Sequence, residues 1–183
     1  MITYSTSKTE KDLLGILALQ KINLPINLSA EEITKEGFVT ISHSFEELKK
    51  MNAIEQHIVA KEDDNVIAYL LAMTSVSKKD IPVLIPMFEK FDSLKLNGEI
   101  FSSYHYIVVG QVCVAKDYRG QGILNNCYQA YKNRFSKKYD LAVTDINTKN
   151  LRSINAHKKI GFFEIDRFIA SDNEEWSIVV WEW

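Results

Sequence analysis

The sequence predicts a mixed α/β domain of the α+β class, and three observations carry this prediction. Over the second half of the chain, strands and helices are expected in the order strand, helix, strand, helix, strand, which is typical of a sheet covered by helices. The length of 183 residues suits one domain with its own core. A composition of 46% apolar and 25% charged residues is that of a folded globular protein. We therefore expect residues 1–183 to form a single domain.

The first half of the chain contains the shorter and less regular elements. An apolar cluster at 13–19 predicts a first helix. Two S-x-x-E patterns, Ser29 with Glu32 and Ser44 with Glu47, predict capping boxes at the starts of two short helices. The other elements expected here are a strand at 38–41, a hairpin of strands at 57–61 and 66–73, and a helix at 83–91.

The second half has clearer signals. A β-rich run at 104–115 predicts a strand, and Gly110 within it predicts a bulge or a local opening between strands. Two glycines, Gly120 and Gly122, precede an expected helix that reaches about Lys138. The chain is expected to end with a strand at 141–146, a helix at 151–160, a strand after Gly161 and a last strand at 176–183.

Charge and composition exclude several classes of protein. The formal net charge of -2, with dispersed Lys and Arg, argues against binding to nucleic acid. Neither a secretory signal nor an apolar run of membrane-spanning length is present, so we expect a cytoplasmic protein with no membrane partner. The two cysteines, Cys113 and Cys127, and the scattered histidines do not form a metal-ligand pattern, so no metal is expected.

The segment 112–124 reads as a strand, a short turn and the start of a helix. Glycines at 120 and 122 allow backbone N–H groups to approach an anion, and the helix N-terminus adds positive potential there. Arg119 offers a further charged contact to a diphosphate. A turn that needs glycine only for its conformation is the alternative. A nucleotide loop lacks its Gly-Lys-Ser/Thr, and Asn125 replaces the third glycine of a dinucleotide fingerprint.

The run from Arg119 to Ile123, preceded by Val112-Cys113-Val114, resembles the acetyl-CoA signature Q/R-x-x-G-x-G/A of the GNAT superfamily of N-acetyltransferases. Arg119 and Gly122 match that signature, whereas Leu124 occupies its final small position. A second resemblance lies downstream, to the element N-x-x-A-x-x-x-Y-x-K-x-G-F. Its positions are Asn150, Ser153 in the place of the small residue, His157 in the place of the tyrosine, Lys159, Gly161 and Phe162.

The resemblance, which covers about residues 104–170, implies a GNAT-like three-layer fold. Its central sheet would be mixed, mostly antiparallel and twisted, with about 6–7 strands, and would be splayed at the fourth strand, where acyl-CoA lies. It also implies that pantetheine pairs with the backbone of Val112 and Val114. The cofactor-binding residues expected from it are Val112, Cys113, Val114, Arg119, Gly120, Gln121, Gly122, Ile123, Leu124, Asn150 and Ser153.

The activity implied by the resemblance is transfer of an acetyl group from acetyl-CoA (coenzyme A) to a primary amine by direct attack in a ternary complex. The acceptor would be a small molecule or a peptide, and the protein a monomer or a homodimer. The alternative is a non-catalytic acyl-CoA-binding or regulatory module on the same fold. Substrate recognition would fall to the first two helices, to residues 38–51 and to the Trp-rich last strands.

The candidate catalytic residues are His157 and Cys113. His157 stands where the family has a tyrosine that protonates the CoA thiolate, and an imidazole can donate a proton near neutral pH. Water or Ser153 are the alternatives to His157. The backbone N–H of Cys113, or that of Val114, could polarise the thioester carbonyl. The Cys113 thiol could also be a nucleophile, but a plain buried thiol is the favoured interpretation. The general base is not identified, although Glu99, Tyr106 and Gln111 lie on or near the fourth strand.

Overall fold

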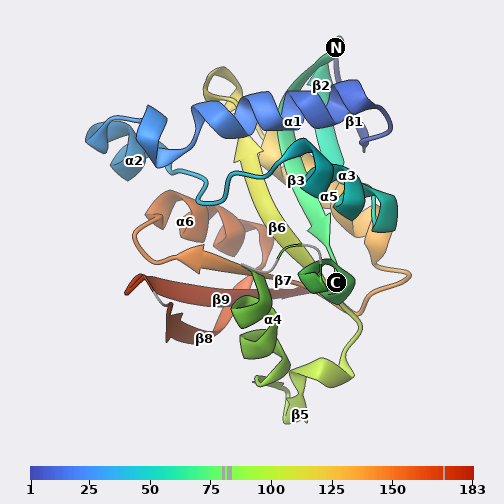
Figure 1. Ribbon diagram of the computed structural model, residues 1–183, viewed down its shortest axis with the longest axis vertical. Helices are drawn as coiled ribbons and strands as arrows, with labels where there is room; N and C mark the ends of the chain where they lie inside the picture. The colour runs from blue at the N-terminus through green and yellow to red at the C-terminus, as the bar shows by residue number, and fades with distance from the viewer. Residues whose placement is uncertain (80, 82–83, 171) are drawn as a thin grey trace.

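The computed structural model describes residues 1–79, 81, 84–170 and 172–183 (Figure 1). The helices are α1 (Glu10–Ile22), α2 (Ala30–Glu36), α3 (Phe45–Ile54), α4 (Ile85–Asp92), α5 (Ile123–Phe135) and α6 (Leu151–Ile160). The strands are β1 (Ile2–Thr6), β2 (Ile58–Glu62), β3 (Asn65–Met73), β4 (Lys95–Leu96), β5 (Glu99–Ile100), β6 (Tyr106–Val114), β7 (Leu141–Asn147), β8 (Phe163–Ile169) and β9 (Glu175–Glu182).

Seven strands form one sheet in the order β1-β2-β3-β6-β7-β9-β8. Only the β6–β7 pair of this sheet is parallel, and α5 makes the crossover that a parallel pair requires. The remaining pairs are antiparallel. This confirms the predicted mixed, mostly antiparallel sheet. The small β4–β5 hairpin lies outside it, in the segment between β3 and β6.

The sheet opens at β6, its fourth strand, as expected. The parallel register runs only from Tyr106↔Leu141 to Val108↔Val143. One residue further, the Thr144 hydroxyl donates to the carbonyl of Val109 at 2.8 Å, and the strand pairing goes no further. A bulge between β3 and β6 adds to the divergence, because three residues of β3, 70–72, lie opposite four residues of β6, 109–112. Both outcomes expected at Gly110, a bulge and an opening, are therefore present.

Helices cover both faces of the sheet and give three layers (Figure 1). One apolar cluster packs α1, α3 and α4 against one face, and a second packs α5 and α6 against the other. The alternation of β7 shows this division, since Val143 belongs to the first cluster and Ala142 and Ile146 to the second. The open end of the β6–β7 pair thus has the C-terminal end of α1 and the end of α2 on one side and the N-termini of α5 and α6 on the other.

Most sequence-predicted elements are present within a few residues of the expected bounds. Both capping boxes are formed, with Ser29 and Ser44 as N-caps. In the predicted helix at 83–91, Val83 lies outside the described residues and the helix begins at Ile85, with Pro86 in its first turn. One expectation is wrong, because residues 38–41 pair with no neighbouring strand and form no strand themselves. The structure also adds strand β1, which was not predicted and which pairs with β2.

Within the described residues, no helix is long and apolar enough to cross a membrane. In the same part of the chain, no three His, Cys, Asp or Glu side chains gather as metal ligands would.

Candidate active site

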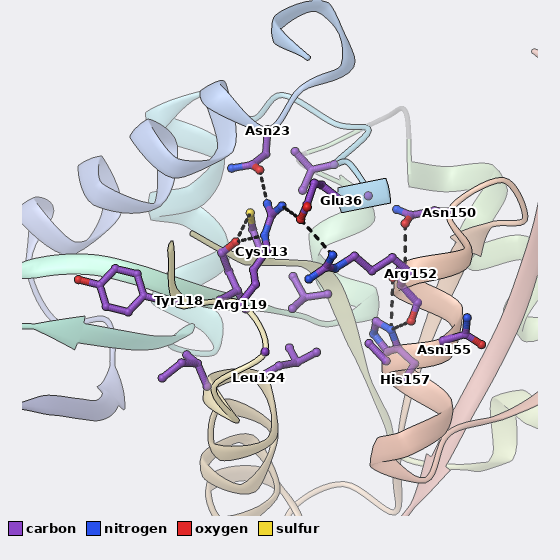
Figure 2. A pocket seen from close by; sticks show the side chains of 18 of the residues that line it. Asn23, Glu36, Cys113, Tyr118, Arg119, Leu124, Asn150, Arg152, Asn155 and His157 are labelled. Carbon is purple, nitrogen blue, oxygen red and sulfur yellow. Dashed lines mark hydrogen bonds and ion pairs between the residues drawn. The ribbon is translucent and has the colours of Figure 1, made fainter. Parts of the chain in front are cut away.

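A pocket of about 530 Å³ opens between the N-termini of α5 and α6, beside the free edge of β6 (Figure 2). The last residue of α2, Glu36, and the three residues that follow it, 37–39, form another wall. Ten of the sequence-predicted cofactor-binding residues line this pocket: Val112, Cys113, Val114, Arg119, Gly120, Gly122, Ile123, Leu124, Asn150 and Ser153. Gln121 does not line it, because its exposed side chain turns back and donates to the carbonyl of Asp117.

The N-terminus of α5 offers free backbone donors to this pocket. Gly122 is the N-cap with φ of 78°, and no side chain caps the helix. The first backbone bond of the helix runs from the N–H of Asn126 to the carbonyl of Gly122, so earlier N–H groups lack helical acceptors. Gly120 also has a positive φ of 76°, and a Cβ at either glycine would meet open space. These features fit a diphosphate at the helix N-terminus.

The side chain of Arg119 is engaged by protein groups. Its Nε donates to the carbonyl of Val114 at 2.9 Å, Nη2 to Asn23 at 2.7 Å and Nη1 to Glu36 at 2.9 Å. The hydrogen bond from Arg119, helped by the charge of Arg152, lowers the pKa of Glu36. Arg119 therefore fastens the glycine loop to β6 and α1, a contribution that the sequence motif did not reveal.

The free edge of β6 presents alternate residues to the pocket. The N–H of Ala115 donates to Ile67 of the β3 side at 2.8 Å. Because successive strand residues direct their N–H groups to opposite edges, the N–H of Cys113 also faces β3. Val112 and Val114 face the opening. The pairing of pantetheine with these two positions stays a prediction, and of the two N–H groups considered for polarising the carbonyl only that of Val114 faces the opening.

The thiol of Cys113 is buried, with 7% of the residue exposed. Burial raises its pKa to about 12, although Arg119 opposes the shift, so the thiol stays protonated at neutral pH. A protonated thiol is a poor nucleophile, which supports the interpretation of Cys113 as a small buried side chain. Its role in catalysis stays a prediction.

Asn150 and Ser153 organise the start of α6. The Asn150 side-chain oxygen caps the helix by accepting from the N–H of Ser153 at 3.2 Å. Its amide nitrogen donates to the carbonyl of Phe38 at 2.9 Å and so fixes the segment that follows α2. Gly37, with φ of 74°, lies against the same side chain, where an added Cβ would come within 2.7 Å of the Asn150 oxygen. Asn150 thus joins α6 to the wall of the pocket.

His157 lines the pocket wall, but both of its ring nitrogens are engaged. Nδ1 lies 2.8 Å from the carbonyl of Ser153, which can only accept, so we assign the proton to Nδ1. Nε2 then accepts from the Tyr128 hydroxyl at 2.6 Å. Burial lowers the pKa of His157 to about 4, and the ring is neutral at neutral pH. A neutral imidazole is a weak acid, so the proposed thiolate-protonating role stays a prediction with Ser153 and water as the alternatives.

A narrow cleft of about 60 Å³ continues from the pocket into the opening between β6 and β7. Both spaces are lined by Phe38, Val39 and Val112 from one side. Asp145 of β7 lines the narrow cleft, and by strand alternation it follows Val143 on the face that carries α1 and α4. The narrow cleft therefore contains a carboxylate.

The carboxylate of Asp145 has no hydrogen bond or ion pair to another described residue. Burial raises its pKa to about 6, and its own backbone N–H offsets only part of this shift. The residue is partly buried, and its place in the wall of the cleft gives an approach to it. A carboxylate with a pKa near neutrality and a free approach from one side has the properties of a general base.

Sequence reasoning missed Asp145, although a signal for it exists. An aspartate inside the apolar strand 141–146 is unusual, because an unpaired buried carboxylate costs stability.

The other residues near the fourth strand are less suitable as a general base. The Tyr106 hydroxyl donates to Asp92, and burial raises its pKa. Gln111 lines the cleft but carries no charge, and Glu99 is exposed in the β4–β5 hairpin. Trp176, one of the aromatics noted in the last strands, also lines the cleft.

Comparison with known families agrees with this geometry. Residues 27–162 match the model of the acetyltransferase (GNAT) family, which spans both motifs and the segment that walls the pocket. The chain therefore belongs to the GNAT acetyltransferase family. Membership supports an acyl-transferring enzyme in general and does not name a substrate. No curated protein matches the sequence significantly.

Solved structures share the fold at low sequence identity. The NatC complex bound to Gag peptide and CoA includes a chain with 13% identity and a TM-score of 0.65, covering 100% of this chain and 98% of that one. The ribosomal-protein-S18-alanine N-acetyltransferase from Escherichia coli has 12% identity and a TM-score of 0.64, with coverage of 100% and 94%. Arabidopsis thaliana Naa50 with the bisubstrate analogue CoA-Ac-MVNAL has 14% identity and a TM-score of 0.62, with coverage of 100% and 99%.

Proposed function

We propose that this chain transfers an acetyl group from acetyl-CoA to a primary amine, with Asp145 as the general base. The observation that carries the proposal is the meeting of two spaces at the open end of β6 and β7. One has an anion-binding helix N-terminus, and the other has an unpaired carboxylate. An acyl donor and an amine that enter from these two sides would meet beside the free edge of β6, which favours direct attack.

In this scheme each group has a defined task. The N–H groups at the start of α5 hold the diphosphate, and Val112 and Val114 pair with the pantetheine amides. An N–H of this free edge that does not pair with pantetheine polarises the thioester carbonyl. Asp145 accepts the proton that the amine loses as the new N–C bond forms. The departing thiolate receives a proton from Ser153 or water, or through His157.

The amine acceptor is either a small molecule or the amino group of a peptide. Two structures with the same fold hold peptide-like ligands, a Gag peptide and the MVNAL analogue, which favours testing peptides alongside simple amines. The cleft of about 60 Å³ admits only the reacting amine and the atoms next to it. The rest of the acceptor would lie outside this cleft.

A thiol-release assay with acetyl-CoA and a panel of small amines and peptide N-termini tests the function. We expect acceptor-dependent release of free CoA above the background hydrolysis, with one acetyl group added per thiol released. Mass spectrometry of the product identifies the acetylated nitrogen. If CoA binds but no acceptor in a broad panel accelerates thiol release, the alternative of a non-catalytic acyl-CoA-binding module is favoured instead.

A further inference from the structure

The carboxylate of Glu36 lies in the cofactor pocket between two arginines (Figure 2). One of its oxygens, Oε2, accepts from Nη1 of Arg119 at 2.9 Å and from Nη1 of Arg152 at 3.0 Å. Arg119 belongs to the loop before α5, whereas Arg152 belongs to the first turn of α6. A single carboxylate oxygen therefore joins two guanidinium groups from opposite walls of the pocket.

An acidic side chain at this place opposes the binding of an anionic cofactor. Coenzyme A carries a diphosphate and a separate phosphate, and like charges a few ångströms apart repel each other strongly in a partly buried site. A phosphate oxygen is also the same kind of acceptor as a carboxylate oxygen, and arginine binds both in similar geometry. Glu36 and a phosphate cannot both occupy the position between Arg119 and Arg152.

The two arginines differ in how firmly the protein holds them. Nε and Nη2 of Arg119 are fixed by Val114 and Asn23, so this guanidinium can exchange only its contact to Glu36. Arg152 is more exposed, at 40% of its side chain, and its Nη1 also donates to the carbonyl of Lys35. Loss of Glu36 would therefore leave Arg119 in place and free Arg152 to follow a ligand.

We propose that Glu36 takes the place of a cofactor phosphate in the free protein, and that acyl-CoA binding displaces it from Arg119 and Arg152. The two guanidinium groups then bind the phosphate through the donors that Glu36 had occupied. This inference rests on the proposed cofactor site and adds Glu36 and Arg152 to it. Neither residue belongs to the family signature quoted above.

The helix that carries Glu36 can move at small cost. None of the residues of α2 is buried, and Gly37 follows it with φ of 74°. Besides the contacts of Glu36, polar links hold α2 in place, among them the ion pair of Glu32 with Lys116 at 3.0 Å.

Calorimetric titration of Glu36→Gln with CoA tests this inference. We expect binding about tenfold tighter than in the wild type, the effect of removing one partly buried charge from the site. Glu31→Gln is the matched control, because Glu31 lies in the same helix, is exposed and pairs only with Lys35. Its affinity should equal that of the wild type.

A double-mutant cycle with Arg152→Gln sharpens the result. Arg152→Gln alone should weaken CoA binding, and the gain from Glu36→Gln should shrink in that background, since the two residues act on one position. Glu36→Asp keeps the charge but shortens the side chain, so it should increase CoA affinity less than Glu36→Gln does. It replaces Glu36→Gln in the titration if that variant is unstable. Unchanged or weaker CoA binding by a folded Glu36→Gln variant would overturn the inference. A wild type that binds no CoA would instead contradict the proposed function.

Discussion

Asp145→Asn is expected to lower kcat/KM for acetyl transfer by about 10²–10⁴-fold, the usual contribution of a positioned general base. The amide has nearly the same shape but cannot accept the proton. In the wild type, kcat/KM should fall as the pH is lowered through about 6, where Asp145 becomes protonated. The variant should lack this step. Steady-state kinetics from pH 5 to pH 9 with one amine measures both the loss of kcat/KM and the missing pH step.

The stability of the same variant separates a catalytic effect from unfolding. The pKa of Asp145 is raised from 3.8 to about 6 in the folded protein, so its ionisation costs stability, which is lost as the pH rises from about 3.8 and is fully lost above about 6. Asp145→Asn should therefore be at least as stable as the wild type at alkaline pH, and the difference should vanish at acidic pH, where both states hold the proton. Asp166→Asn, which removes a carboxylate of β8 paired with Lys90, is the control and should keep its activity. Full activity of Asp145→Asn would refute the assignment.

Gly122→Trp is expected to weaken CoA binding by roughly 100-fold or more, equivalent to about 2.8 kcal/mol. The indole would project into the open space in front of the α5 N-terminus, where the diphosphate is expected to bind. Calorimetric titration with CoA measures the loss. The substitution also strains the backbone, because φ is 78° at this position.

Gly98→Trp controls for that strain. Gly98 has φ of 88° and open space around its Cβ position, but it lies in the β4–β5 turn. Both variants should lose similar stability in thermal unfolding, and only Gly122→Trp should lose CoA binding. Equal CoA affinity for the two folded variants would mean that the diphosphate lies elsewhere.

The parts of the structure that could be predicted from the sequence depend on local signals. The turn at Gly120 and Gly122 and the helix at 151–160 are encoded by neighbouring residues, and both occur where expected. The capping boxes at Ser29 and Ser44 are local in the same sense. Family resemblance then supplied the splayed sheet, which no short stretch of residues specifies by itself.

The parts that could not be predicted depend on residues far apart in the chain. Strand β1 exists because residues 58–62 pair with it, and its five residues, with only Ile2 and Tyr4 alternating as apolar side chains, are too short a pattern to identify a strand. The segment 38–41 has the composition of a strand, yet it is held across the opening by Asn150. The contact of Glu36 with Arg119 spans 83 residues and leaves no trace in either local sequence.

Asp145 illustrates a different limit. Its pKa and its free approach arise from the divergence of β6 and β7, which ends strand pairing just before it. The sequence shows an aspartate in an apolar strand but not whether a partner neutralises it. Only the arrangement of the surrounding strands distinguishes a candidate base from a buried ion pair.

The central claim is that the opening between β6 and β7 holds acyl-CoA by its diphosphate at the start of α5. Calorimetric titration of the wild-type protein with acetyl-CoA, and with ATP in a parallel experiment, tests it most directly. We expect saturable binding of one acetyl-CoA per chain and much weaker binding of ATP, because ATP lacks the pantetheine that pairs with Val112 and Val114. Absence of acetyl-CoA binding at millimolar ligand, or equal affinity for ATP, would contradict the claim.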